Sequence, residues 1–277
     1  MGRVEGKVAF VTGAARGQGR SHAVRLAEEG ADIIAVDLCA EVRGMGYPAA
    51  TPEDLAETVG LVEALDRRIV ATQADVRDYD GLRRALDDGV AQLGRLDIVA
   101  ANAGIGSLAY AAQDISDEIW QDMIDINLTG VWHTTKAATS HLVSGGNGGA
   151  IVITSSAAGL KGYANVAHYS SAKHGLVGLM RTLAAELGPY NIRVTSIHPT
   201  QVATDMVMND STYRLFLPDK DNPTQDDFRE ASQLMHMLPI PWVESVDISN
   251  ALLFLASDEG RYITAVALPV DAGVTQH

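Results

Sequence analysis

The chain has 277 residues, of which 47% are hydrophobic and 20% are charged, as in ordinary globular proteins. A net charge of −14 argues against binding to nucleic acid or to an anionic membrane surface, because both attract clustered Lys and Arg. The single cysteine, Cys39, excludes an internal disulfide and a metal site built from several cysteines. With no signal-peptide pattern and no long apolar run, we expect a soluble cytoplasmic protein.

Short β-branched runs alternate with amphipathic segments of helical length. This alternation predicts βαβ units and a parallel sheet, and most of the runs are apolar throughout, as in strands covered on both faces. The predicted strands are Val8–Thr12, Asp32–Val36, Ile69–Ala74, Leu96–Ala101, Ala150–Ser155, Arg193–His198 and Val266–Val270. The predicted helices are Gly19–Glu29, Glu53–Arg67, Tyr79–Leu93 and Tyr169–Leu187.

Two segments interrupt the alternation. Residues Cys39–Pro52 are rich in Gly, Pro and Ala and are predicted to form an inserted loop. Residues 205–241 form a long apolar segment without clear periodicity. Such a segment is expected to form a lid that covers the substrate. Because no linker or repeat divides the chain, we expect one domain that spans residues 1–277.

A glycine-rich turn follows the first predicted strand. Its sequence is Thr12-Gly13-Ala14-Ala15-Arg16-Gly17-Gln18-Gly19, and a helix follows directly. Such a turn lets the backbone approach a pyrophosphate, which the helix N-terminus then binds through its N–H groups. A tight turn without a ligand is the alternative interpretation.

Asp37 ends the second predicted strand, 18 residues after Gly19. A carboxylate at this distance can accept both hydroxyls of an adenosine ribose and repels a 2′-phosphate, which favours NAD over NADP. Arg16 is a counter-signal, because a basic side chain beside the turn could meet a 2′-phosphate.

Tyr169 and Lys173 lie four residues apart, and therefore on one face of a predicted helix. A phenol with its ordinary pKa near 10 is a poor base at neutral pH. A neighbouring ammonium favours the phenolate, so we expect Lys173 to lower the pKa of Tyr169. An ordinary surface pair is the alternative interpretation of this spacing.

Several motifs occur together in one order. They are Thr12-Gly13-x-x-x-Gly17-x-Gly19, Asn102-Ala103-Gly104, Asn127, Ser155-Ser156 and Tyr169-x-x-x-Lys173. This combination resembles the classical short-chain dehydrogenase/reductase family over residues 6–273. The resemblance implies an α/β fold, a single-domain Rossmann fold with a doubly wound seven-stranded parallel sheet in the order 3-2-1-4-5-6-7. It further implies an insertion after the second strand, a lid before the last helix and a homotetramer.

The resemblance also implies a role for each site residue. Ser156 would orient the substrate oxygen, and Tyr169 would transfer the proton. Lys173 would bind the nicotinamide ribose, and Asn127 would hold a water that links Lys173 to solvent. The implied cofactor contacts are Gly13, Arg16, Gly17, Gln18, Gly19, Asp37, Leu38, Asp75, Val76, Asn102, Ala103, Gly104, Tyr169, Lys173, Val202 and Thr204. Thr200 replaces the glycine common after the sixth strand, and no metal site is expected.

A closer resemblance is to the mycofactocin-associated, carveol-dehydrogenase-like branch of this family. It rests on Gly17-Gln18-Gly19-Arg20-Ser21-His22, on the insertion and on His198-Pro199-Thr200. It implies tightly held NAD under the inserted loop, an external redox carrier and a small apolar, terpenoid-like alcohol or ketone as substrate. A sugar-nucleotide epimerase and a non-catalytic NAD(P)-sensing protein are the alternative functions.

Overall fold

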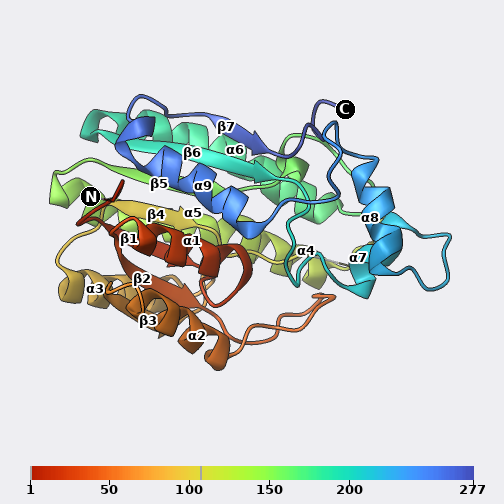
Figure 1. The fold of residues 1–277 in the computed structure, drawn as a ribbon, viewed down its shortest axis with the longest axis horizontal. Helices are drawn as coiled ribbons and strands as arrows, with labels where there is room; N and C mark the ends of the chain where they lie inside the picture. Colours follow the sequence, from red (N-terminus) through yellow and green to blue (C-terminus); the bar gives the residue numbers. More distant parts are fainter. Residues whose placement is uncertain (1, 107) are drawn as a thin grey trace.

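A sheet of parallel strands forms the centre of the molecule (Figure 1). The computed structural model describes residues 2–106 and 108–277. The described residues form seven strands in the order β3-β2-β1-β4-β5-β6-β7, which confirms the predicted topology. The strands are β1 (Val8–Thr12), β2 (Asp32–Asp37), β3 (Ile69–Gln73), β4 (Ile98–Ala101), β5 (Gly149–Thr154), β6 (Ile192–Pro199) and β7 (Ala267–Val270).

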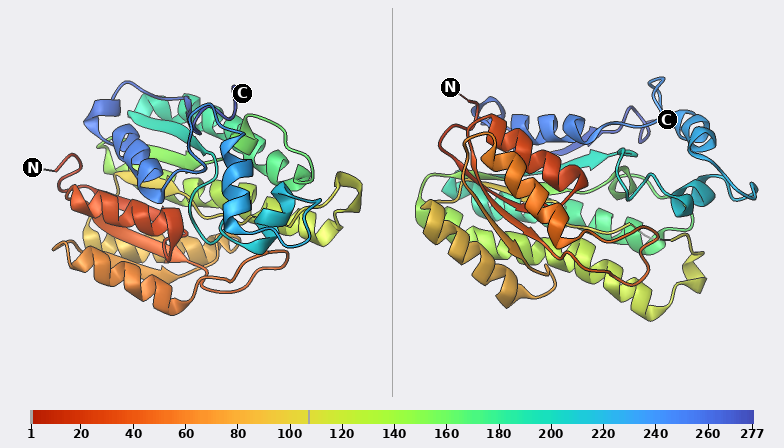
Figure 2. Two further views of the ribbon diagram at one scale, coloured as in Figure 1. Left: turned by 45° about the vertical axis from the view of Figure 1, so that its right-hand side comes forward. Right: turned by 60° about the horizontal axis from the view of Figure 1, so that its bottom comes forward.

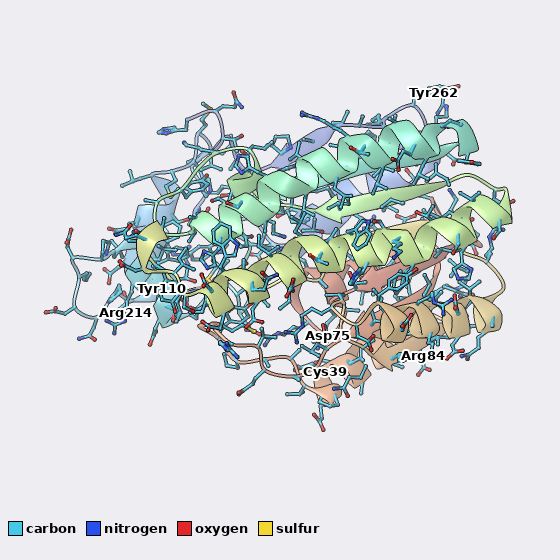
Figure 3. The ribbon with its side chains drawn as sticks, turned by 180° about the vertical axis from the view of Figure 1, so that it is seen from behind. Cys39, Asp75, Arg84, Tyr110, Arg214 and Tyr262 are labelled. Atoms are coloured by element: carbon cyan, nitrogen blue, oxygen red, sulfur yellow. The ribbon has the colours of Figure 1, made fainter. Side chains whose placement is uncertain are left out.

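Helices cover both faces of the sheet (Figures 1 and 2). On one face lie α1 (Gly17–Glu28), α2 (Pro52–Glu63) and α9 (Ser245–Ala256). On the other lie α3 (Tyr79–Leu93), α5 (Gly130–Gly145) and α6 (Ala167–Leu187), which run side by side in the view from behind (Figure 3). Among the described residues, every helix falls short of what is needed to cross a membrane.

Each strand contributes side chains to two separate apolar cores. In β1, Val8 and Phe10 face the helices of one layer, while Ala9 and Val11 face the helices of the other. All four side chains are almost completely buried. Burial on both faces explains why the strands are apolar throughout and do not alternate with polar residues.

The carboxyl ends of the strands carry the remaining elements (Figures 1 and 2). They are α4 (Asp117–Ile124), α7 (Asp210–Phe216) and α8 (Gln225–Gln233), with the π-helical turn η2 (Asp125–Thr129) between α4 and α5. Of the 3₁₀ turns, η1 (Ala112–Asp114) and η3 (Ala157–Gly159) follow β4 and β5, whereas η4 (Gly188–Tyr190) and η5 (Asp258–Gly260) precede β6 and β7 at the opposite end of the sheet. The strand order reverses between β1 and β4, and ligands of open α/β sheets bind at such a point.

The structure corrects several predicted boundaries. Helices α1 and α6 begin two residues before the predicted starts, and α2 ends at Glu63 instead of Arg67. The earlier end of α2 follows from Asp66, whose φ of 56° is left-handed and cannot continue a helix. Residues 205–241 are not irregular throughout, because they contain α7 and α8. Helices α4 and α5 were not predicted from the sequence, and α9, the last helix expected after the lid, was predicted without bounds.

Candidate active site

The turn between β1 and α1 is shaped by glycine. Gly13 and Gly17 have left-handed backbones, with φ of 69° and 54°. A Cβ on Gly19 would stand 1.8 Å from the carbonyl oxygen of Gly13, so a larger residue is excluded there. Arg16, the N-cap residue of α1, makes no side-chain cap hydrogen bond. The helix N-terminus therefore offers N–H groups to a phosphate, as predicted from the sequence.

The carboxylate of Asp37 is held in a fixed orientation at the end of β2. It accepts a hydrogen bond from the backbone N–H of Ala15 at 2.9 Å and another from that of Cys39 at 3.0 Å. Both oxygens keep further lone pairs, which suit the two hydroxyls of a ribose. This geometry matches the NAD-selecting role predicted for Asp37.

One cavity at the carboxyl ends of the strands brings the predicted cofactor residues together. Of these residues, the cavity is lined by Gly13, Arg16, Gly17, Gln18, Gly19, Asp37, Leu38, Asp75, Val76, Asn102, Ala103, Gly104, Tyr169, Lys173 and Thr204. Val202 is the exception, because its side chain is buried where Val202 pairs with Val243. Its contact with the nicotinamide stays a prediction.

Asp75 lies beside this cavity, but its carboxylate already has a partner. Arg77 donates to both carboxylate oxygens, at distances of 2.7 to 3.0 Å. The backbone N–H of Ala74, the residue before Asp75, donates to the carbonyl oxygen of Asp37 at 2.8 Å, which places Asp75 near the end of β2. The Arg77 contact fixes Asp75 at the end of β3, where an adenine ring was expected.

The insertion after β2 forms one wall of the same cavity. Its lining residues are Leu38, Ala40, Val42, Met45, Tyr47, Ala49 and Ala50. Tyr47 accepts a hydrogen bond from the backbone N–H of Gly106 at 3.1 Å, which ties the insertion to the chain after β4. Burial raises the pKa of Tyr47 to about 12. Because Tyr47 comes from an aperiodic segment, the sequence did not single it out.

Arg16 connects this wall to the segment after β6. Its guanidinium forms an ion pair with Asp205 at 2.9 Å and donates a hydrogen bond to the carbonyl oxygen of Pro48. It also lies 5.7 Å from the centre of the Tyr47 ring. Arg16 is thus engaged within the protein, which removes the counter-signal to NAD that its charge gave in the sequence.

Ser156, Tyr169 and Lys173 lie together, although Ser156 is not among the residues that line the cavity. Ser156 and Tyr169 share a side-chain hydrogen bond, and the Nζ atom of Lys173 lies 5.6 Å from the centre of the Tyr169 ring. Lys173 is 4% exposed and donates a hydrogen bond to the carbonyl oxygen of Thr154 at 3.1 Å. Tyr169 and Lys173 line the cavity, together with Ser155.

The pKa values correct one expectation. Burial raises the pKa of Tyr169 above its ordinary value, and the hydrogen bond with Ser156 acts in the opposite direction with a smaller effect. Burial also lowers the pKa of Lys173 to about 8. The expected net lowering of the Tyr169 pKa is therefore wrong for this structure, because loss of solvation outweighs the hydrogen bond with Ser156.

Asn127 is fixed in the π-helical turn η2. Its Oδ1 atom accepts from the backbone N–H of Ile105 at 2.8 Å, and its Nδ2 atom donates to the carbonyl oxygen of Ile105 at 2.8 Å. Asn127 Oδ1 and Lys173 Nζ both lie beside Gly104, at 2.6 and 3.5 Å from the place of a Cβ. Asn127 is fully buried and stands behind the lining of the cavity. The predicted water between Asn127 and Lys173 stays a prediction.

The lid segment contributes little of its aromatic surface to the cavity. Trp242 stacks on Phe228 at a centroid distance of 5.9 Å, and Phe216 packs edge-on against the same ring at 4.9 Å. Met206, by contrast, lines the cavity, and a Cβ on Gly106 would stand 2.9 Å from its Cγ. Within residues 205–241, Asp205 and Met206 therefore line the cavity, whereas the three aromatic rings pack against one another.

The cavity fits NAD. A Cβ on Gly13 would stand 2.9 Å from the Cα of Ala103, so the glycine turn and the end of β4 are in close contact. Within residues 2–106 and 108–277, the Oε1 atom of Gln18 is buried and has no hydrogen-bond partner. A buried acceptor without a partner at a cavity wall is expected where a ligand supplies the donor.

Known proteins resemble the chain over its full length. A model of the short chain dehydrogenase family matches residues 7–214. The (-)-trans-carveol dehydrogenase of Rhodococcus erythropolis is 60% identical over 275 residues, which cover 99% of each chain. The crystal structure of carveol dehydrogenase from Mycobacterium avium in complex with NAD is 64% identical, with a TM-score of 0.99 and full coverage of both chains. A short chain dehydrogenase from Mycobacterium paratuberculosis bound to NAD is 47% identical, with a TM-score of 0.92 and full coverage of both chains.

Proposed function

The chain belongs to the short-chain dehydrogenase family, and from this membership we propose that it interconverts a small apolar secondary alcohol and its ketone. It is an NAD-dependent oxidoreductase, like the relatives that were crystallised with NAD. The meeting of Ser156 with Tyr169 and Lys173, two residues that line the cavity, carries the proposal. At this place the nicotinamide and the substrate carbon would meet.

Bound NAD supplies the acceptor of the hydride, and the residues of this chain supply position and proton transfer. The Ser156 hydroxyl orients the substrate oxygen beside the phenol of Tyr169. Because burial keeps the phenol protonated at neutral pH, Tyr169 is a ready proton donor for ketone reduction. In alcohol oxidation Tyr169 accepts the proton instead, and the buried ammonium of Lys173 stabilises the phenolate that this step requires.

The proposed substrate is terpenoid-like. Met206 and Ile105 give the cavity an apolar wall beyond the polar catalytic residues. A flexible thioether adapts to an irregular apolar ring and offers no hydrogen bond to a polyol. The relative of 60% identity is named for carveol, a compound of this class.

The cofactor is proposed to stay bound between turnovers. Support comes from Arg16, which links the insertion and the segment after β6 beside the cavity. Reduced cofactor that does not leave needs an external redox carrier, as in the mycofactocin-associated branch. We further propose a homotetramer in the cytoplasm, as is usual for this family.

The central test is Tyr169→Phe, assayed with a panel of cyclic apolar secondary alcohols and with polar polyols. Turnover of the apolar alcohols should fall by about 10²-fold or more, because the proton donor and acceptor is lost. The NAD released on denaturation, measured by mass spectrometry, should be unchanged. Tyr190→Phe is the matched control, because Tyr190 is a 53% exposed tyrosine in the turn η4 that does not line the cavity. Near-normal turnover of Tyr169→Phe would rule out the mechanism, and turnover of polyols alone would rule out the substrate class.

A further inference from the structure

His198 is a buried side chain that the mechanism above does not use. It is the penultimate residue of β6 and is fully buried. Its Nδ1 atom lies 2.8 Å from the carbonyl oxygen of Ser156, and its Nε2 atom lies 2.8 Å from the hydroxyl of Ser196. Ser196 and His198 are two residues apart on one strand, so both side chains point to the same side of the sheet.

These two contacts fix the tautomer of the ring. A carbonyl oxygen can only accept, so Nδ1 carries the hydrogen and donates it to Ser156. In the neutral ring Nε2 is then an acceptor, which the hydroxyl of Ser196 satisfies. The pKa of His198 is lowered to about 4, mainly by burial and to a smaller extent by the nearby charge of Lys173. The hydrogen bond to Ser156 acts in the opposite direction and raises the pKa. The ring is therefore neutral at physiological pH.

The contact lies where regular strand pairing ends. The last paired residues of β5 and β6 are Thr154 and Ile197, and the last backbone bond runs from Ser155 N to Ile197 O at 2.8 Å. The next chain segment turns into η3, so the carbonyl of Ser156 lies beyond the sheet. At this carbonyl the imidazole N–H of His198 replaces the backbone N–H that a continuing strand would donate.

The position of the Ser156 hydroxyl depends on the orientation of its own backbone. Its hydroxyl accepts from the backbone N–H of Ala158 at 3.1 Å and is hydrogen-bonded to Tyr169. Its carbonyl oxygen accepts a second bond from the N–H of Gly159 at 2.8 Å. A rotation of this peptide would move the hydroxyl away from Tyr169, and His198 is the contact from β6 that opposes such a rotation.

We propose that His198 is a positioning residue for Ser156, which acts through the hydrogen bond from its Nδ1–H to the Ser156 carbonyl and is itself oriented by Ser196. The proposal rests on the substrate-orienting role proposed for Ser156. His198 does not line the cofactor cavity, and it acts on the reaction only through the serine.

The test compares His198→Asn with His198→Gln. The Asn amide places an N–H donor near the position of Nδ1, whereas the longer Gln amide places it near Nε2. His198→Gln should lower kcat by about tenfold or more, as expected when a catalytic group is misplaced by a fraction of an ångström. His198→Asn should recover most of this loss, while the NAD content and the thermal midpoint of both variants match each other. If the two variants have equal kcat, or if kcat falls only in proportion to bound NAD, the proposal is wrong.

A double variant separates this proposal from the role of Ser156. If His198 acts through Ser156, Ser156→Ala combined with His198→Gln should be no slower than Ser156→Ala alone. An additional loss in the double variant would overturn the inference about His198 only. Full activity of Ser156→Ala would instead overturn the proposed role of the serine. Should the His198 variants fail to fold, Ser196→Ala tests the same hydrogen-bond chain and should lower kcat by a smaller factor, and an unchanged kcat would contradict the proposal.

Discussion

Arg16 and Asp37 are two side chains of opposite charge that bear on the preference for NAD over NADP. Arg16 is engaged by Asp205 and by the carbonyl of Pro48, so its charge is partly compensated within the protein. Asp37 is oriented by two backbone N–H groups and presents its charge to the cavity. A 2′-phosphate at this place would face the carboxylate, and this repulsion favours NAD.

Asp37→Asn should therefore relax the selectivity. The amide keeps one of the two acceptor oxygens that the backbone N–H groups use and loses the negative charge, so the preference for NAD over NADP should fall by about tenfold, which corresponds to roughly 1.4 kcal/mol. Calorimetric titration of both nucleotides into protein stripped of its cofactor measures the ratio. Asp32→Asn, at the opposite end of β2, is the control and should leave it unchanged. An unaltered preference in Asp37→Asn would refute the ribose contact.

Much of the site could be predicted at the level of single residues, because its motifs are local in sequence. Gly13, Asp37, Tyr169 and Lys173 line one cavity as expected. The ion pair of Arg16 and Asp205 could not be predicted, because its two residues are 189 positions apart and Asp205 belongs to no local motif. The pKa of Tyr169 was predicted in the wrong direction, because sequence spacing reports the neighbouring charge but not the depth of burial.

At the scale of elements, polar contacts connect the insertion and the lid segment to each other and to the segments beside the cavity. Tyr47 is bonded to Gly106, and the hydroxyl of Ser211 in α7 donates to the carbonyl of Gly46 at 3.2 Å. The ion pair of Arg16 and Asp205 adds a third connection. These three contacts join segments that are far apart in sequence.

Asp205→Asn should speed the release of NAD. Because Asp205 is mostly exposed, the ion pair contributes up to about 1 kcal/mol, so the exchange rate should rise by up to about fivefold. Exchange of bound NAD for isotopically labelled NAD measures the rate. Asp221→Asn, an exposed carboxylate of the same segment, is the control. Equal rates in both variants would show that the ion pair does not retain the cofactor.

Helices were less predictable than strands for physical reasons. Strands β1, β2, β4 and β5 are short, mostly apolar runs, and their burial makes them conspicuous. Helix α8 has nine residues and begins with a capping box from Thr224 to Asp227, but it is too short for an apolar period to emerge. Helix α5 is rich in threonine and alanine, and its Trp132 is 42% exposed, so its apolar face is weakly marked.

At the scale of the whole molecule, buried histidines make the fold sensitive to mild acid. Burial lowers the pKa of His22 to about 3, and its Nδ1 atom lies 2.8 Å from the hydroxyl of Ser249. In the unfolded chain the same group titrates near 6.5. Below that pH the unfolded state binds a proton that the folded state does not. The stability contributed by neutral His22 is thus complete above pH 6.5 and is lost as the pH falls towards 3.

His22→Asn should flatten this decline. The variant should be less stable than the parent at pH 7, because it repacks a fully buried site. Between pH 6 and pH 5, however, its free energy of unfolding should fall less steeply than that of the parent. The two slopes should differ by about 1.4 kcal/mol per pH unit. Urea denaturation at fixed NAD concentration gives both slopes. Parallel pH dependence of the two proteins would show that His22 does not titrate on unfolding.

The π-helical turn η2 makes the orientation of Asn127 depend on the number of residues between α4 and α5. The backbone N–H of Gly130 bonds to the carbonyl of Asp125, five residues back, where an α-helix would use four. Deleting one residue from this turn would restore regular α-helical winding and rotate the two flanking helices against each other by about 100°. Asn127 could then not face Ile105 while α4 and α5 keep their present packing. The length of the turn between α4 and α5 therefore sets the geometry of this part of the site. A substitution in the turn changes the contacts of one side chain, whereas a one-residue deletion changes the relative rotation of both helices.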